Sequence, residues 1–431
     1  MAEDKLPTGK IERASKFLKT GLKVGLNYAK HYTKKAFTDV SDDELEKENA
    51  KELFDSFASL KGSALKVAQM LSQDSMNLSS NFTEQFQKAQ YSVPPMSAPM
   101  AIQTFKKSVG ENPEKIFDKF NPNAVAAASL GQVHEAWKDG KKLAVKIQYP
   151  GVAESIKSDL KLMKPIAKKI LTVSSEELEP YMNELETKLL EETNYIQEVN
   201  NSLEFREACK ELKNIVFPNY YKELCTDRVI VMDWLDGVHM KEFLATNPTQ
   251  EQKNYFAQII WDFYEFQFHK INKINADPHP GNFLFRSDNT VGVIDFGCTK
   301  VFAGKVYEDY FGLANYELYK DPEKVRKVFF DLEILRPTDS EERIKELIEL
   351  FSVLSKMIAK PYQYKTFYFG DLEFLEEVNQ ISKIAASIGE IRGKKDFLFV
   401  NRTFFGIFSL MKELNATINT QCHYLPFLKY D

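Results

Sequence analysis

The sequence contains few cysteines and no long apolar run, and both absences exclude classes of protein. Its four cysteines, Cys209, Cys225, Cys298 and Cys422, lie far apart without a C-x-x-C pair, and the six histidines form no ligand-spaced cluster with them. Neither a disulfide framework nor a structural zinc site is therefore indicated. The apolar run at 404–411 is well short of the roughly 18 residues that span a bilayer. Because the N-terminus also carries no secretory signal pattern, we expect a cytoplasmic protein without a membrane-spanning segment.

The chain also lacks a net basic charge, because 57 Lys and Arg stand against 62 Asp and Glu, for a net charge of −5. We therefore expect no nucleic-acid partner. Residues 1–35 differ from this average, with nine basic and three acidic residues and a local charge of +6, which leaves −11 for the remainder. Apolar residues recur there at helical spacing (Ile11, Leu18, Leu22), which predicts a basic amphipathic segment over residues 1–40. This segment either lies peripherally on an anionic membrane or packs on the protein with its lysines in solvent.

Hydrophobic periodicity separates the remaining chain into helical and β-rich parts. It predicts helices at roughly 49–76, 82–90, 98–119, 152–171, 176–212 and 250–270, a β-hairpin within 124–148 with its turn at Asp139-Gly140, short strands at 215–218, 228–232, 283–285 and 291–295, and an almost wholly helical pattern from about 305. We divide the body into a helical extension at 41–120, a smaller lobe at 121–236 and a larger lobe at 237–431.

A loop of small residues lies before the first strand of this hairpin. A kinase nucleotide fold places G-x-G-x-x-G-x-V over the phosphates, and the lysine of A-x-K on the next strand contacts them. Gly131 and Val133 stand at the third glycine and the valine, while Ala126 and Ala128 replace the first two glycines. The predicted nucleotide-binding residues are Ala126, Ala127, Ala128, Ser129, Gly131, Val133 and Lys146. Taken alone, an alanine-rich hairpin can equally be a packing feature.

Two later segments carry the residues expected of phosphoryl-transfer chemistry. Asp277 and Asn282 are five positions apart, as are the Asp and Asn of the kinase catalytic loop, and Asp295 begins a D-F-G sequence. Asn282 and Asp295 offer hard oxygen ligands that suit Mg²⁺. Asp277 is placed to orient or deprotonate an attacking hydroxyl group or water.

The strand at 228–232 leads into a sequence typical of the kinase hinge. Met232 is predicted at the back of an adenine pocket, and the backbones of Asp233 and Leu235 are predicted to contact the base. An ordinary edge strand followed by a turn is the alternative.

Three strings together resemble the UbiB/AarF family of atypical protein-kinase-like proteins. They are the alanine-rich loop at 127–134, the catalytic segment at 276–282 and the helix at 62–72. The resemblance implies an α+β, bilobal protein-kinase-like fold with an N-terminal helical extension and a mostly helical C-terminal lobe. It also implies ATP and Mg²⁺ as cofactors and a link to isoprenoid-quinone (ubiquinone) lipid metabolism, with a lipid or quinone precursor as a partner.

Two motifs of this family are altered here. The K-x-G-Q motif, which implies a regulatory role for Lys66 and Gln69, has Ala68 in place of its glycine. The E-x-D motif has Asn194 in place of its aspartate, and Glu192 is predicted to pair with Lys146.

We expect ATP hydrolysis, or phosphoryl transfer to a small or lipid acceptor, at a nucleotide bound between the two lobes. Asp277, Lys146 and Glu192 are the predicted catalytic residues. A protein substrate is disfavoured because no A-P-E sequence follows Asp295. Two alternatives remain at this point: a small-molecule kinase of the aminoglycoside or choline type, and a nucleotide-binding pseudokinase that acts as a scaffold.

Overall fold

The computed structural model describes residues 15, 51, 95–127, 130–171, 175–378, 380, 392–428 and 430. The chain forms two compact units, Met1–Asn200 with Asn219–Trp234, and Asn201–Pro218 with Leu235–Asp431. The predicted segments at 1–40, 49–76 and 82–90, and the motif residues Lys66 and Gln69, lie outside the described residues except for single positions.

The first unit contains a five-stranded antiparallel sheet. Its order is β1 (Lys119–Phe120), β3 (Gly131–Lys138), β4 (Lys141–Gln148) and β6 (Val229–Asp233), and β2 (Ala126–Ala127) pairs with β3. The hairpin turn is at Asp139 and Gly140, which both have positive φ (51° and 72°). A two-residue turn of this kind matches the twist of the flanking strands. The predicted hairpin and its turn are thus confirmed.

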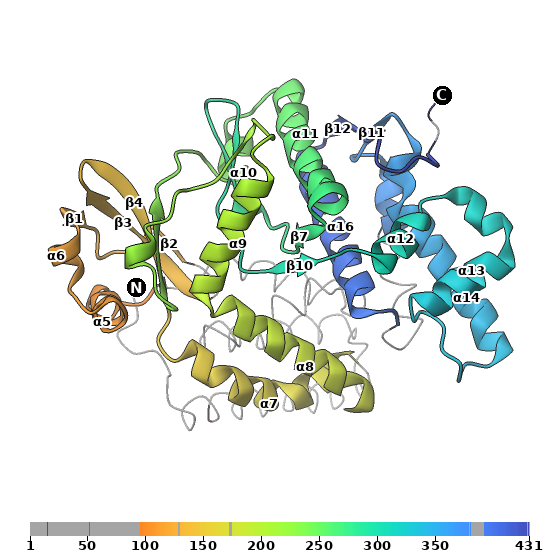
Figure 1. Cartoon of the computed structure of the whole chain (residues 1–431), viewed down its shortest axis with the longest axis horizontal. Helices are drawn as coiled ribbons and strands as arrows, with labels where there is room; N and C mark the ends of the chain where they lie inside the picture. Colours follow the sequence, from red (N-terminus) through yellow and green to blue (C-terminus); the bar gives the residue numbers. More distant parts are fainter. Residues whose placement is uncertain are drawn as a thin grey trace, which may run out of the picture. The chain divides into compact units, whose positions relative to one another are not determined.

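Helices α5 (Ala98–Val109) and α6 (Pro113–Ile116) lie beside this sheet (Figure 1). A single helix was predicted over 98–119, but Gly110 in the left-handed conformation (φ 97°) ends α5, and Pro113 begins α6 because its fixed φ suits the first turn. The buried core of the unit joins α5 to β4 and β6 and includes Phe105, Val145 and Val231.

Three longer helices follow the hairpin: α7 (Val152–Leu171), α8 (Ser175–Glu192) and α9 (Tyr195–Ala208). Helix α7 begins and ends at the residues predicted from the sequence, and it packs against α8 (Figure 1). The single helix predicted over 176–212 is interrupted at Thr193 and Asn194, which separates α8 from α9 and changes which side chains face the sheet.

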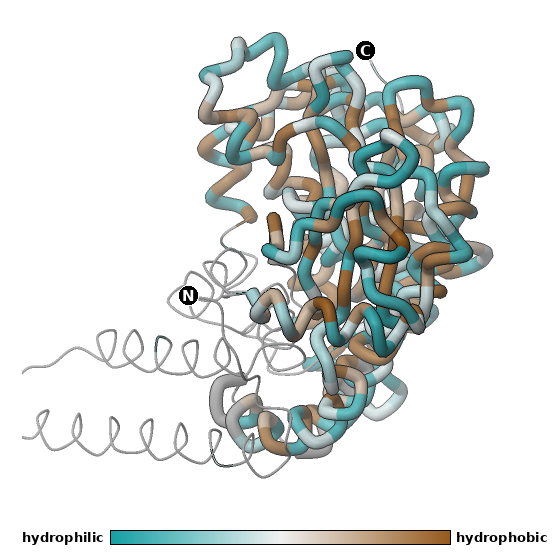
Figure 2. Tube along the Cα trace, turned by 90° about the vertical axis from the view of Figure 1, so that its left-hand side faces the viewer, coloured by the Kyte–Doolittle hydropathy of each residue, from teal (hydrophilic) through white to brown (hydrophobic). Residues whose placement is uncertain are grey.

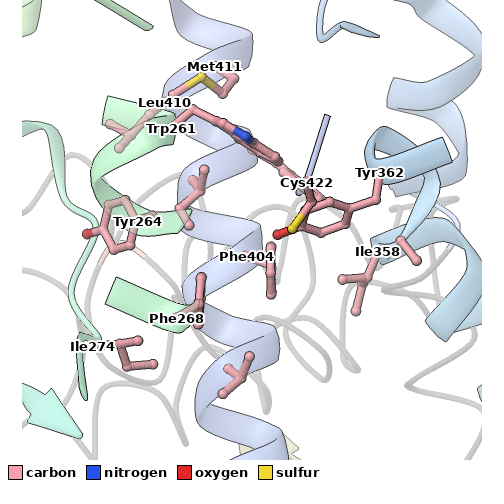
Figure 3. Packing of buried hydrophobic residues seen from close by; sticks show 14 of the residues in the cluster. Trp261, Tyr264, Phe268, Ile274, Ile358, Tyr362, Phe404, Leu410, Met411 and Cys422 are labelled. Atoms are coloured by element: carbon pink, nitrogen blue, oxygen red, sulfur yellow. The ribbon is translucent and has the colours of Figure 1, made fainter. Parts of the chain in front are cut away.

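The second unit is mainly helical. Its helices are α10 (Met240–Ala245), α11 (Gln250–Phe266), α12 (Lys305–Gly312), α13 (Pro322–Asp331), α14 (Glu341–Ile358) and α16 (Lys395–Glu413), with a π-helix η4 (Gln267–Ile271) directly after α11 and 3₁₀ turns η6 (Tyr316–Lys320) and η7 (Lys360–Gln363). Apolar and hydrophilic segments alternate along the trace (Figure 2), as amphipathic helices require. Helix α11 and the π-helix η4 pack against α16, and Figure 3 shows the buried aromatic side chains of Trp261 in α11, Phe268 in η4 and Phe404 in α16.

Three small sheets complete this unit: β5 (Ile215–Val216), β9 (Val291–Val293) and β8 (Phe283–Phe285); β7 (Lys273–Asn275) with β10 (Thr299–Val301); and β11 (Thr366–Tyr368) with β12 (Thr417–Asn419). Strands β7, β10, β11 and β12 were not predicted, because each has three residues and depends on a partner distant in sequence. The predicted α+β class is confirmed. Among the described residues, no helix is both long enough and apolar enough to cross a bilayer.

Candidate functional site

Lys146 lies on β4 of the first unit and is almost fully buried. Its Nζ donates to both carboxylate oxygens of Glu198, at 2.7 and 3.0 Å. The Tyr195 ring centroid lies 5.0 Å from the same nitrogen. The Glu198 side chain is only 4% exposed, so the pair is shielded from water and holds the lysine in one position.

This pair corrects the prediction that Glu192 would be the carboxylate on Lys146. Glu192 ends α8, whereas Glu198 lies in the first turn of α9. The interruption between the two helices resets the helical phase, so the periodicity of a single helix could not identify the inward-facing carboxylate. The later Glu198 and Asn201 form an E-x-x-N spacing in the sequence, which is the signal that could have found both.

Asn194, which stands in place of the family's aspartate, begins α9. Its side-chain Oδ1 accepts a hydrogen bond from the Gln197 backbone N–H at 3.1 Å. Asparagine satisfies one of the unpaired N–H groups of a helix start about as well as aspartate does. The altered position therefore still positions the helix that carries Glu198.

The described part of the small-residue loop requires glycine at one position. A Cβ on Gly131 would lie 2.6 Å from the Ile147 carbonyl oxygen and 2.6 Å from the Tyr195 hydroxyl. Ala126 and Ala127 pair with Val133 and Gln132 as β2 and β3, and Ala128 and Ser129 lie outside the described residues. Gly131 therefore allows close packing of β3, β4 and the start of α9, a structural role beyond the approach to phosphate.

The predicted hinge residues fall in both units. Met232 is buried on β6 and pairs with Ala144. The Asp233 backbone N–H donates to the Asn219 carbonyl oxygen at 2.9 Å, and its carboxylate accepts hydrogen bonds from Asn219 Nδ2 and Tyr221 Oη. The N–H of Asp233 is thus already engaged within the first unit, while Leu235 belongs to the second unit.

In the second unit, the predicted catalytic loop follows β7 and includes a 3₁₀ turn, η5 (Pro280–Asn282). Asn282 Nδ2 donates to the Asp277 carbonyl oxygen at 2.9 Å. The Asp277 N–H donates to Asn275 Oδ1 at 3.3 Å. Because the Asn282 amide nitrogen faces the loop, its Oδ1 is the atom presented for other contacts. Asn275, which the sequence analysis did not identify, supports the loop from β7.

Asn275 also supports the D-F-G segment, because its Nδ2 donates to the Asp295 carbonyl oxygen at 2.9 Å. The Asp295 Oδ1 accepts the Gly297 N–H at 2.9 Å. Asn201 Nδ2 donates to the Phe296 carbonyl oxygen at 3.1 Å, and the Phe296 ring is fully buried. Asp277 and Asp295 thus belong to two segments that share one buried asparagine.

The predicted catalytic loop packs against α16 through a glycine that was not identified from the sequence. A Cβ on Gly406 would lie 2.3 Å from Pro278 Cγ. Glycine at this position therefore lets the loop approach the helix backbone closely. Only the tertiary structure reveals this requirement, since the two residues are more than 100 positions apart.

The negative charge of the loop affects the pKa of a neighbouring tyrosine, Tyr264. Burial raises the pKa of the Tyr264 hydroxyl well above its usual value, and the negative charge of Asp277 raises it further. Tyr264 therefore stays neutral beneath the loop. The oxygen donors of Asn282 and Asp295 are of the kind that Mg²⁺ binds, and an aspartate beside them can orient an attacking oxygen.

Comparison with known proteins identifies relatives along most of the chain. A family model described as ABC1 atypical kinase-like domain matches residues 88–329, more than half of the chain. Probable serine/threonine-protein kinase abkA of Dictyostelium discoideum is 25% identical, over 96% of this chain and 78% of its own length. Atypical kinase COQ8, mitochondrial, of Saccharomyces cerevisiae is 26% identical, over 96% of this chain and 84% of its own.

Other relatives are longer: the chain spans 44% of an aarF domain-containing protein kinase of Arabidopsis thaliana whose name places it in the chloroplast. Among solved structures, the complex of Rv3197 with erythromycin from Mycobacterium tuberculosis matches with a TM-score of 0.58 and 24% identity. That match covers 88% of this chain and 95% of the other, and it shows a likeness of fold.

Proposed function

Because the chain belongs to the ABC1 atypical kinase-like family, we propose that it binds Mg²⁺-ATP and hydrolyses it or transfers its γ-phosphoryl group to a small or lipid acceptor. Family membership and the similarity of fold confirm the expected α+β, bilobal kinase-like fold. They also favour this assignment over that of a small-molecule kinase of the aminoglycoside or choline type.

The buried ion pair between Lys146 and Glu198 carries the proposal. Placing two charges in the interior is expensive unless each satisfies the other, and a lysine held this way is what a kinase fold uses to position ATP phosphates. Both carboxylate oxygens face the lysine, so its ammonium group is fixed before a nucleotide binds.

The proposed chemistry follows from groups described above. Asn282 and Asp295 would hold magnesium, which would neutralise charge on the phosphates when bound. Lys146 would hold the α- and β-phosphate oxygens. Asp277 would accept a hydrogen bond from the attacking hydroxyl group or water and orient its oxygen toward the γ-phosphorus. The alanine-rich loop at 126–131 would cover the phosphates, and Met232 would line the adenine site.

We further propose that the substrate of this protein is a lipid or an isoprenoid-quinone precursor. The support is the resemblance of the sequence motifs to the UbiB/AarF family and the similarity to the yeast protein named COQ8. The basic segment at residues 1–35, which lies outside the described residues apart from Ser15, is proposed to bind an anionic membrane surface.

The test compares Mg²⁺-ATP turnover by the full chain with that of Asp295→Asn, each with and without anionic liposomes. The expected result is turnover by the wild type and loss of at least about tenfold in the variant, because the variant removes a charged metal ligand. Asp288→Asn, on the exposed turn between β8 and β9, is the matched control and should keep wild-type turnover. If the wild type and Asp295→Asn bind nucleotide equally and neither turns it over, the protein is a pseudokinase.

Membrane binding has a separate test. Co-sedimentation with anionic liposomes should weaken as salt is added and on deletion of residues 1–35, because screening and the lost lysines both reduce the attraction. Unchanged sedimentation after the deletion would show that this segment does not bind the membrane.

A further inference from the structure

Three side chains distant in sequence converge inside the second unit. Glu265, His269 and Cys422 each present a ligand atom, and these atoms all lie within 4.8 Å of one another. His269 Nε2 is 3.4 Å from Glu265 Oε2 and 3.4 Å from Cys422 Sγ. The His269 side chain is fully buried, and Cys422 is 2% exposed. A carboxylate, an imidazole and a thiol thus face one another away from water.

These distances fit a tetrahedral metal site. With metal–nitrogen and metal–oxygen bonds of about 2.0–2.1 Å and a metal–sulfur bond of about 2.3 Å, ligand atoms in a tetrahedron are about 3.3–3.6 Å apart. Both measured separations from His269 Nε2 fall in this range. The cluster therefore needs little movement to surround an ion.

The carboxylate supplies an independent observation. Glu265 is 8% exposed, and its Oε2, which faces the histidine, is buried without a hydrogen-bond partner among the described residues. Burying a carboxylate oxygen without a hydrogen bond lowers the stability of the folded protein. A cation at the centre of the cluster would satisfy it.

The surrounding groups orient the ligands as they do in known metal centres. The Tyr362 hydroxyl donates to Glu265 Oε1, which leaves Oε2 directed at the cluster. His269 Nδ1 lies 2.7 Å from the Tyr307 hydroxyl, so the second ring nitrogen, Nε2, is the one presented to the other two ligands. A hydrogen bond at the far nitrogen of a ligating histidine, and at the far oxygen of a ligating carboxylate, is typical of metal sites.

The local fold explains how the cluster forms. Glu265 lies in the last turn of α11 and His269 in the π-helix η4, four residues later, so both point to the same side. Cys422 follows β12, and Gln258 of α11 holds this strand by exchanging hydrogen bonds with the Asn419 backbone. Figure 3 shows Cys422 and Tyr362 among the buried side chains around α16.

We propose that Glu265, His269 and Cys422 bind one zinc ion, which fastens the C-terminal segment to α11. These three ligands span more than 150 residues of the chain, so they form none of the short-range ligand spacings by which a zinc site is recognised in a sequence. Thiolate and imidazole favour zinc over magnesium or calcium. Binding converts the Cys422 thiol to a zinc thiolate and releases its proton to solvent. One carboxylate, one thiolate and Zn²⁺ then sum to zero charge in the buried site.

The test measures zinc in the full-length protein by elemental analysis after dialysis against buffer with a trace of zinc. The wild type should retain about one zinc ion per chain, and Cys422→Ser and His269→Gln should each lose at least about 90% of it. Cys209→Ser is the matched control, because Cys209 is equally buried in the same unit but outside the cluster. Zinc absent from the wild type, or retained equally by Cys422→Ser, would overturn the proposal.

Two further measurements guard against a variant that fails to fold. Tyr307→Phe keeps all three ligands but removes the hydroxyl at His269 Nδ1, and it should weaken zinc binding by about 10- to 100-fold. In the wild type, a zinc chelator should speed alkylation of Cys422, mapped by mass spectrometry, and leave Cys209 unchanged. Equal alkylation of Cys422 with and without the chelator would also overturn the proposal. Neither readout depends on ATP turnover, so this proposal can fail while the proposed function stands.

Discussion

Removing one side of the Lys146–Glu198 pair should destabilise the protein more than the sum of its contacts suggests. The two side chains are 11% and 4% exposed, and Nζ lies 2.7 and 3.0 Å from the carboxylate oxygens. Breaking a buried pair on one side leaves an uncompensated charge and costs about 3–5 kcal/mol. Replacing both partners with apolar residues of similar volume is often near neutral. Lys146→Met and Glu198→Leu should therefore each cost about 3 kcal/mol or more.

The double variant should cost at least about 2 kcal/mol less than the sum of the two single variants. Urea denaturation followed by circular dichroism gives the free energies of unfolding for this cycle. Glu192→Gln tests the carboxylate that the sequence favoured, and it should cost less than Glu198→Leu, because both Glu198 carboxylate oxygens accept from Lys146 Nζ. Additive single-variant costs, or a Glu192→Gln cost equal to that of Glu198→Leu, would refute the assignment of the pair.

Three other predictions follow from the same structure. Gly406→Ala should displace the predicted catalytic loop, because the new Cβ would lie 2.3 Å from Pro278 Cγ, and we expect ATP turnover to fall about 100-fold. Gly312→Ala is the control, because no atom lies within 4 Å of its Cβ. This control should leave ATP turnover unchanged and raise the melting temperature slightly. Burial lowers the pKa of His134 below its usual 6.5, so as the pH falls this imidazole is protonated in the unfolded chain before it is protonated in the folded protein. The free energy of unfolding should therefore be constant above about pH 6.5 and decrease as the pH falls below that value. The melting temperature of His134→Gln should decline less steeply than that of the wild type over the same pH range. Asn194→Ala should cost about 1 kcal/mol of unfolding free energy by removing the cap of α9, whereas Asn194→Asp should preserve it; equal melting temperatures for the alanine variant and the wild type would contradict the capping role.

Local sequence patterns predicted the parts of the fold that local interactions determine. The hairpin turn at Asp139 and Gly140, helix α7 and strand β8 all appear where residue propensities and periodicity placed them. Spacing alone also located Asp277 and Asn282 on one loop, whose hydrogen bond the structure shows.

The features that sequence reasoning missed depend on tertiary contacts. Glu198 was not assigned to Lys146 because the interruption at Asn194 shifts the helical phase by a few residues. Strands β7 and β10 are short and stable only as a pair. The packing of Gly406 on Pro278 and the convergence of Cys422 with Glu265 join residues more than 100 positions apart, which no window of sequence can reveal.

The contact between Gly406 and Pro278 also bears on where this protein can be cut. The family model ends at residue 329, but the helix against which the catalytic loop rests is α16, at Lys395–Glu413. A fragment trimmed to the family boundaries would contain the loop and its acidic residues while lacking the surface that supports them. It would also expose the aromatic faces of α11 that α16 covers. Such a fragment should aggregate, and the smallest autonomous unit of this protein therefore extends well beyond the recognisable domain.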